Sequence, residues 1–165
     1  DWNAFFFGNR RRLAADTVAP DTFYLYQWKT GALDVSTDGG ATWQTRFTGL
    51  PTYTYHSQLK GAPGARGHLW FARGRDHAAS SSSLLHSTDG GATWQPVPFF
   101  DQAWAIGFGR GREARDPSAV IVYGRAAGAD SSQAWGVYRS LDQGLTWTRL
   151  SGRPLGLFDV VTTIN

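Results

Sequence analysis

The sequence contains no cysteine and no methionine, and its acidic residues include a single glutamate, Glu113. Without cysteine the chain has no disulfide, no thiol nucleophile and no thiolate metal ligand. A mechanism that needs two glutamates is excluded within these 165 residues. No apolar run approaches the about 18 residues of a membrane-spanning helix, so we expect no contact with a membrane.

The chain also lacks a starting methionine and an opening hydrophobic segment of the kind that directs secretion. We therefore expect a processed form or a piece of a longer protein. The length fits one domain with a substantial core, at about 150 residues per domain. The net charge of +3 permits only a weak preference for anions, and apart from Arg10–Arg12 the basic residues are scattered. We predict no nucleic-acid partner.

Tryptophan is abundant instead, with eight residues, and three of them end copies of one motif. Ser-Thr-Asp-Gly-Gly-Ala-Thr-Trp occupies residues 36–43 and returns unchanged at 87–94, and the looser Ser-Leu-Asp-Gln-Gly-Leu-Thr-Trp occupies 140–147. The copies start 51 and 53 residues apart, and a fixed period of this length indicates a repeat architecture. The shared positions, which we expect to be structural, are Ser36, Asp38, Gly40, Thr42, Trp43, Ser87, Asp89, Gly91, Thr93, Trp94, Ser140, Asp142, Gly144, Thr146 and Trp147.

Each copy has the composition of a tight β-hairpin. Its aspartate can accept hydrogen bonds from N–H groups of its own turn, and its fifth residue, always glycine, suits a backbone with positive φ. The tryptophan can cover the turn, and burying one indole contributes roughly 4–6 kcal/mol. We therefore assign the three aspartates to the turns and not to catalysis.

Strand-forming runs fill the rest of each period, and no segment shows a convincing amphipathic helix. The predicted first strands are 12–15, 57–60, 105–108 and 160–164, the second strands 22–28, 67–72 and 120–123, and the third strands 32–36, 84–87 and 135–140. Four short strands in about 50 residues are typical of a β-propeller blade. The sequence therefore predicts an all-β fold of four-stranded antiparallel blades, at about 10–48, 56–98 and 104–150, with the first strand of a further blade at 159–165.

Three blades do not close a ring, because propellers usually have four to eight. An open arc would expose two sheet edges and an uncovered central face. We therefore expect a partial propeller that is completed by further blades of the same or another chain.

The repeated motif resembles the Asp-box, or bacterial neuraminidase repeat, which occurs in sialidases, in the sortilin family, in a photosystem assembly factor and in glycoside hydrolase family 74. The flanking sequence looks like the second propeller of family 74. The stretches that carry this resemblance are Leu13–Asp16 and Thr22–Tyr26 before the first copy, Gly67–Ala72 and Leu85–Ser87 before the second, and Ala105–Gly109 and Gly136–Ser140 before the third. The resemblance implies a seven-bladed propeller, one of two that hold a glucan between them in a xyloglucan hydrolase.

The resemblance also implies an inverting mechanism with two aspartates, one of them in a Gly-Asp-x-x-Gly-Phe context. The dipeptide Gly-Asp does not occur in this chain. We therefore assign no catalytic residue and expect this segment alone to be inactive. Asp101 and Asp159 are the only acids expected near the ligand face, and a catalytic pair formed by them is the weaker alternative.

The ligand face of propellers is commonly formed by the loops that enter the first strands and the loops that join the second and third strands. On our strand prediction these loops are 1–9, 28–31, 52–56, 73–83, 98–104, 126–134 and 152–159. Aromatic rings can stack on sugar rings while nearby polar groups bind hydroxyls, so we select Trp2, Trp28, Tyr55, His56, Asp101, Trp104 and Asp159 as candidate substrate-binding residues.

Blade-to-blade packing is the competing interpretation of these aromatic residues. Trp70 and Trp135 lie inside strand patterns and are expected in the core. The four histidines do not have the spacing of metal ligands, so we predict no metal and no cofactor.

Three functions remain open. The first is a part of a secreted or cell-surface glycoside hydrolase that acts on β-1,4-glucan of the xyloglucan type, with the catalytic acids elsewhere and this segment forming a carbohydrate-binding wall of the cleft. The second is a non-catalytic carbohydrate-binding or adhesion propeller. The third is a protein-binding propeller of the sortilin type, which the absence of cysteine disfavours because that family relies on a cysteine-rich companion domain.

Overall fold

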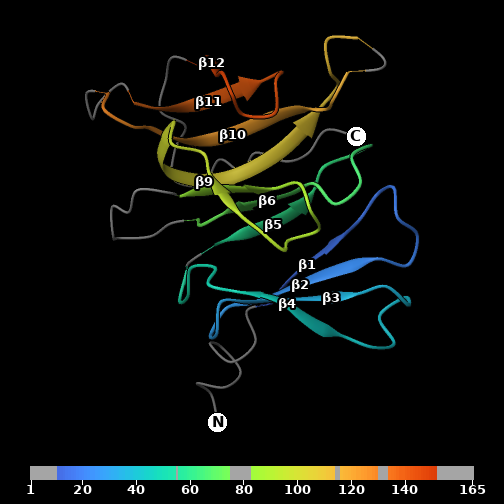
Figure 1. The fold of residues 1–165 in the computed structure, drawn as a ribbon. Coiled ribbons are helices and arrows are strands. Elements are labelled where there is room, and N and C mark those ends of the chain that lie inside the picture. The colour runs from blue at the N-terminus through green and yellow to red at the C-terminus, as the bar shows by residue number, and fades with distance from the viewer. Residues whose placement is uncertain (1–10, 55, 75–82, 114–115, 130–133, 152–165) are drawn as a thin grey trace.

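The computed structural model describes residues 11–54, 56–74, 83–113, 116–129 and 134–151. Their regular structure consists of strands alone, which form three four-stranded antiparallel sheets from strands consecutive in the chain. The sheets lie one above another in Figure 1, the first at the bottom and the third at the top. The predicted all-β fold of three four-stranded antiparallel units is confirmed. The predicted strand at 159–165 lies outside the described residues. The part of the chain that the structure describes contains no helix long and apolar enough to cross a membrane.

The first sheet contains β1 (Arg11–Ala15), β2 (Phe23–Gln27), β3 (Ala32–Ser36) and β4 (Gln44–Thr48). The second contains β5 (Gln58–Gly61), β6 (Leu69–Ala72), β7 (Leu84–Ser87) and β8 (Gln95–Pro96). The third contains β9 (Phe100–Gly109), β10 (Ala119–Ala126), β11 (Trp135–Ser140) and β12 (Thr148–Arg149).

Antiparallel pairing sorts the connections onto two ends of the sheets. The connections β2–β3, β4–β5, β6–β7, β8–β9 and β10–β11 share one end, which we call the loop face. The connections β1–β2, β5–β6 and β9–β10 share the other end with the three repeated hairpins, and we call that end the box face. Backbone bonds agree with this division: the Tyr53 N–H donates to the Trp28 carbonyl on the loop face, and the Gly90 N–H donates to the Gly67 carbonyl on the box face.

The three box hairpins share one hydrogen-bond pattern. In the first, the Ser36 hydroxyl donates to Asp38 Oδ1 at 2.8 Å and accepts from the Gly40 N–H at 2.8 Å. Asp38 also accepts from the Thr42 N–H at 2.9 Å and the Thr42 hydroxyl at 2.5 Å, while the Trp43 indole donates to the Gly40 carbonyl at 3.0 Å. The second and third hairpins repeat all of these bonds.

These bonds keep the box carboxylates ionised. The hydrogen bonds from Thr42 and Thr146 lower the pKa of Asp38 and of Asp142 to about 2. At Asp89 burial raises the pKa, but the bonds from the neighbouring threonine outweigh this effect and bring it to about 2. The carboxylates are therefore held in their turns on the box face, away from the loops expected to meet a ligand.

Two apolar clusters join the sheets face to face. Tyr26 of the first sheet meets Phe71 of the second with ring centroids 4.8 Å apart, inside the cluster between these two sheets. Trp70 of the second sheet and Val122 of the third belong to the cluster between those two. All four residues of β6 are buried, because alternate side chains of a strand point to opposite faces and both faces of this sheet are covered. The expected core position of Trp70, which is 1% exposed, is confirmed.

The glycines of the second and third boxes pack on the preceding sheet. A Cβ atom at Gly91 would overlap the Leu33 side chain of the first sheet. A Cβ atom at Gly144 would lie 2.8 Å from the Trp70 ring of the second sheet. Glycine is therefore needed at these positions for close approach as well as for its backbone conformation.

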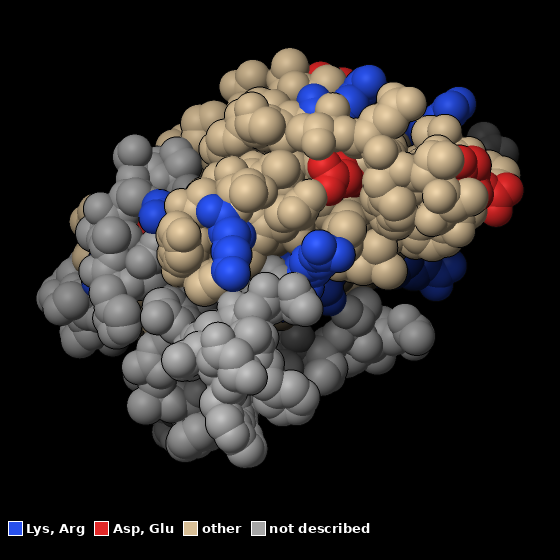
Figure 2. Space-filling view, turned by 90° about the horizontal axis from the view of Figure 1, so that it is seen from below, with Lys and Arg blue, Asp and Glu red and all other residues tan. Residues whose placement is uncertain are grey.

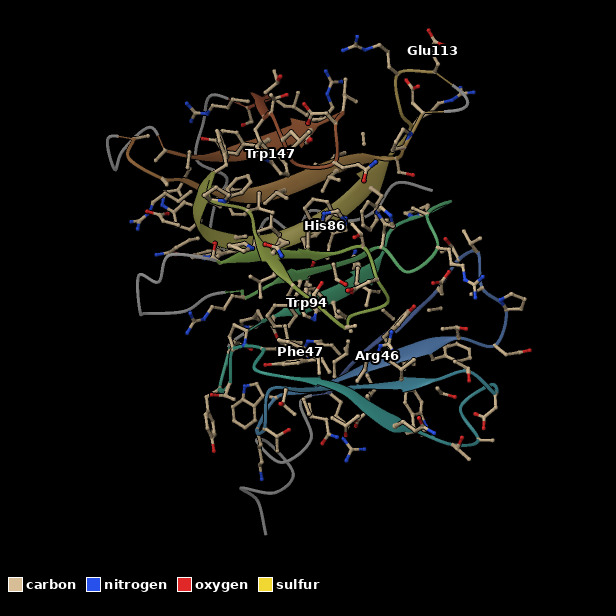
Figure 3. The ribbon with its side chains drawn as sticks, in the orientation of Figure 1. Arg46, Phe47, His86, Trp94, Glu113 and Trp147 are labelled. Carbon is tan, nitrogen blue, oxygen red and sulfur yellow. The ribbon has the colours of Figure 1, made fainter. Side chains whose placement is uncertain are left out.

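The box tryptophans follow the same order. Trp94 packs against the cluster between the first and second sheets, and Trp147 against the cluster between the second and third (Figure 3). Trp43 belongs to the first sheet and is the most exposed of the three, at 37%. Each of the later boxes therefore closes on the sheet before it.

Candidate functional site

The β4–β5 connection on the loop face carries two strained residues. Tyr53 and His56 both have a left-handed backbone, with φ of 53° and 58°. Tyr53 is 61% exposed, and its ring forms a T-shaped pair with Trp28 at a centroid distance of 4.9 Å. Strain of this kind is concentrated at ligand-binding positions, and an exposed tyrosine can stack on a sugar ring. The sequence placed Tyr53 among the residues of the ligand-face loops, but it was not selected as a candidate substrate-binding residue.

Trp28 itself is a packing residue. Its side chain is 9% exposed, lies in the cluster between the first two sheets and donates from Nε1 to the Thr54 carbonyl at 2.7 Å. A loop position favoured contact with a ligand, but Trp28 continues the alternation of β2 and points, like Tyr24 and Tyr26, toward the second sheet. Trp28 therefore does not present the exposed ring that its expected role in substrate binding requires.

His56 borders a hollow of about 350 Å³ between β1 and β5. Arg12 and Leu13 contribute from β1, and residues 57–60 contribute from the second sheet. Arg12 donates from Nε to the Ser57 carbonyl at 2.5 Å, which holds the two inner strands together. His56 is exposed, and burial lowers the pKa of Lys60 in the same hollow. These side chains give the hollow several hydrogen-bond donors.

Two irregularities of β9 shape the loop face of the third sheet. Trp104 is the extra residue opposite the step from Tyr123 to Gly124, and Asp101 is the extra residue opposite the step from Arg125 to Ala126. Extra residues of this kind are β-bulges, which turn a side chain out of the regular alternation and are frequent next to binding sites. Both bulge residues are candidates selected from the sequence.

Trp104 is half-buried within an aromatic group. Its ring centroid lies 4.5 Å from that of Trp135 and 6.1 Å from that of Tyr123, and its indole donates to Gln102 Oε1 at 3.1 Å. Trp135 was expected in the core, but it is only half-buried because it lies at the end of β11 beside Trp104. The group is therefore part of the loop face.

Asp101 forms a two-pronged ion pair with Arg125, whose Nε lies 2.8 Å from Oδ1 and whose Nη2 lies 2.7 Å from Oδ2. Both side chains are partly exposed. Because both carboxylate oxygens are engaged, this pair is better suited to binding hydroxyls than to donating a proton. Arg125 was missed by sequence reasoning, since only the strand register brings it opposite Asp101.

The loop face therefore combines aromatic rings with exposed polar groups, the usual composition of a ligand site. Trp2, Tyr55 and Asp159 lie outside the described residues. In the described ranges no group of three or more histidine, aspartate or glutamate residues could hold a metal ion.

Comparison with known proteins agrees with this architecture. The BNR/Asp-box repeat family matches residues 34–45 and 85–96. The third box, at 140–147, lies outside these matches but makes the same hydrogen bonds.

Longer similarities are to xyloglucanases. A xyloglucanase of Paenibacillus sp is 33% identical over 141 residues, which are 85% of this chain and 13% of that protein. The xyloglucanase Xgh74A of Acetivibrio thermocellus is 33% identical over 153 residues, 92% of this chain and 16% of that protein. The crystal structure of the GH74 enzyme of Niastella koreensis superimposes with a TM-score of 0.70 and 27% identity, over 84% of this chain and 18% of that one.

The chain spans less than a fifth of the length of these relatives. The three similarities nevertheless cover 84–92% of this chain. It carries BNR/Asp-box repeats in a propeller-like fold and is homologous to part of the xyloglucanases of glycoside hydrolase family 74.

Proposed function

We propose that this chain is part of a glycoside hydrolase that acts on β-1,4-glucan of the xyloglucan type, and that its loop face forms one wall of the substrate cleft. The similarity to xyloglucanases supports the substrate class. The observation that carries the binding role is the doubly bulged β9, which turns Trp104 and Asp101 out of the regular pairing at that face.

In this proposal the substrate meets aromatic rings and paired polar groups. Tyr53 and Trp104 stack on the C–H faces of sugar rings, while His56 and the Asp101–Arg125 pair bind hydroxyls. The catalytic acids of the inverting reaction belong to other parts of the protein, so this segment alone is inactive. The protein works outside the cell or at its surface, where it meets the polysaccharide, and further blades complete the propeller.

The exposure of the first box tryptophan supports the presence of further blades. Trp43 is 37% exposed, more than either of its two counterparts. In both later boxes the tryptophan packs against the cluster shared with the preceding sheet. A blade before the first sheet would cover Trp43 in the same way.

Single substitutions separate binding from folding. We predict that Trp104→Ala weakens retention on immobilised xyloglucan by about threefold to tenfold, as expected for loss of one aromatic contact, with a small change in melting temperature. Trp94→Ala is the matched control, because this indole is packed between two sheets and should mainly lower the melting temperature. Equal retention of the wild type and Trp104→Ala, with a large loss of stability in Trp104→Ala, would refute the assignment.

Activity assays distinguish the hydrolase from a binding protein. Reducing-sugar release from xyloglucan by the complete protein, but not by residues 1–165 alone, is the expected result. A non-catalytic carbohydrate-binding propeller is the second candidate, favoured by the engagement of both Asp101 oxygens with Arg125. It predicts retention on xyloglucan without release. Neither release nor retention would instead favour a protein partner.

A further inference from the structure

The box face contains a hollow of about 640 Å³ between the first and second sheets. Gln44 and Arg46 of β4 line it from the first sheet, and Arg66 and Thr88 line it from the second. It lies at the opposite end of the sheets from the loop face. The proposed cleft and its aromatic residues therefore do not account for it.

A β-bulge directs Arg46 into this hollow. The pairing of β3 with β4 shifts between Leu33, opposite Phe47, and Asp34, opposite Thr45, which leaves Arg46 as the extra residue. Phe47 packs in the cluster between the first two sheets, and Arg46 also turns toward the second sheet (Figure 3). Arg46 Nη2 lies 3.4 Å from the Asp89 carbonyl, a weak hydrogen bond that leaves most of the guanidinium donors available.

Arg66 enters the same hollow from the β5–β6 connection. Burial and the neighbouring Asp16 raise the pKa of Tyr24 to about 12, and the positive charges of Arg46 and Arg66 partly oppose this rise. Both guanidinium groups therefore act on one hydroxyl at the wall of the hollow. Among the residues with described positions, neither arginine is paired with a carboxylate.

The two carboxylates at the hollow are occupied by the fold itself. Asp16 accepts four hydrogen bonds, from Val18 N–H at 2.9 Å, Ala19 N–H at 2.8 Å, Gly67 N–H at 2.7 Å and the Tyr24 hydroxyl at 3.1 Å. Asp89 accepts the three bonds of its box hairpin. These hydrogen bonds hold both carboxylates in place and keep them ionised, but neither forms an ion pair with Arg46 or Arg66 among the described residues, and both arginines are exposed to solvent.

We propose that this hollow binds an oxyanion, a carboxylate or a sulfate, carried by a polyhydroxylated ligand such as an acidic polysaccharide. Guanidinium groups bind such anions with paired, charge-assisted hydrogen bonds. The exposed Gln44 and Thr88 provide partners for neighbouring hydroxyls. The hollow is within the size range of small-molecule sites, which is more room than one small ion needs.

Arg46 and Arg66 are the basic residues that line the hollow. On the side of the first sheet shown in Figure 2, basic and acidic side chains are scattered and separated by uncharged surface. Recognition therefore depends on the two converging arginines. Because Arg46 and Arg66 come from different sheets, a bound anion connects the sheets and raises the melting temperature.

The test measures binding of polygalacturonate, of dextran sulfate and of free sulfate by calorimetry at low ionic strength. The variants are Arg46→Gln, Arg66→Gln and the double substitution. Arg110→Gln is the matched control, because Arg110 is an exposed arginine of the β9–β10 connection on the same face but outside the hollow. Each single substitution should weaken polymer binding about threefold to fivefold, and the double variant should weaken it about tenfold to twenty-fivefold.

The outcomes separate local recognition from other causes. We expect Arg110→Gln to bind the polymers as the wild type does. We also expect all variants to keep the wild-type melting temperature in the absence of ligand. An equal loss in Arg110→Gln, or wild-type binding by the double variant, would overturn the proposal. If the protein binds free sulfate but neither polymer, the proposal of a polyhydroxylated ligand is wrong. If it binds none of the three probes, the whole proposal is wrong. Retention on neutral xyloglucan should be unchanged in every variant, so failure here is distinguishable from failure of the proposed function.

Discussion

Among single residues, Gly91 and Gly128 share a left-handed backbone but differ in their surroundings. Their φ values are 82° and 72°, yet a Cβ atom at Gly91 would overlap Leu33, whereas one at Gly128 would meet nothing within 4 Å. We predict that Gly128→Ala costs about 1 kcal/mol of unfolding free energy from backbone strain alone. Gly91→Ala should cost about 2–4 kcal/mol, because overpacking is added. Urea unfolding measures both, and equal losses would show that the contact with Leu33 is unimportant.

His86 makes stability depend on pH. Its ring stacks on Trp70 at 4.0 Å, His68 lies 5.4 Å away, and its Nε2 atom is buried without a hydrogen-bond partner. Burial, with a smaller contribution from His68, lowers the pKa of His86 from 6.5 to about 4.

Because the pKa of His86 is lower in the folded than in the unfolded chain, its contribution to stability is complete above pH 6.5. The contribution is lost as pH falls toward 4, by at most about 1.4 kcal/mol per pH unit before solvent screening. We predict that the melting temperature falls over this interval and that His86→Phe, which keeps a ring against Trp70, flattens the fall. The exposed His56→Phe is the control and should retain the wild-type slope. An unchanged slope in His86→Phe would contradict the assignment.

At the scale of elements, the box hairpins differ in what they cover. Trp94 packs against the cluster between the first and second sheets, whereas Trp43 lies outside both clusters and is 37% exposed. We predict that Trp94→Ala lowers the unfolding free energy by about 2–3 kcal/mol, less than the usual loss for a fully buried aromatic side chain, because this indole is partly buried. Trp43→Ala should cost clearly less. Chemical denaturation of both variants provides the comparison, and a reversed order would mean that the boxes do not join the sheets.

The sequence predicts regular strands well and bulges poorly. Residues 32–36 and 135–140 are strands within the predicted bounds, because alternation and the box motif define them locally. β9 begins at Phe100, five residues before its predicted start, since two bulges allow pairing to continue. A bulge depends on the partner strand and has no local signature.

The candidate site shows the same limit. Asp101 and Trp104 could be selected from loop composition, but their bulged positions and the Arg125 partner follow from register. Trp28 was misjudged because a residue just beyond a strand can keep the strand's alternation and be buried. Tertiary pairing, which one sequence alone does not display, decides each of these cases.

For the whole molecule, burial predicts an order of local stability. β6 of the middle sheet is buried on both faces, whereas most of β1 and of β4 is exposed. We predict that amide hydrogens of β6 exchange most slowly and those of β4 fastest among strands of the first two sheets, because opening the middle sheet breaks both clusters. Hydrogen exchange followed by mass spectrometry tests this order. Uniform exchange across the sheets would indicate one cooperative unit.

The docking of each later box on the preceding sheet gives the molecule a direction of assembly. During synthesis the first sheet leaves the ribosome before the second, so the hairpin at 87–94 meets a finished surface, and the hairpin at 140–147 then meets the next. Removing sheets from the carboxyl end leaves each remaining later box packed on the sheet before it. Removing sheets from the amino end takes away the sheet on which the next box packs, so the two kinds of truncation are not equivalent.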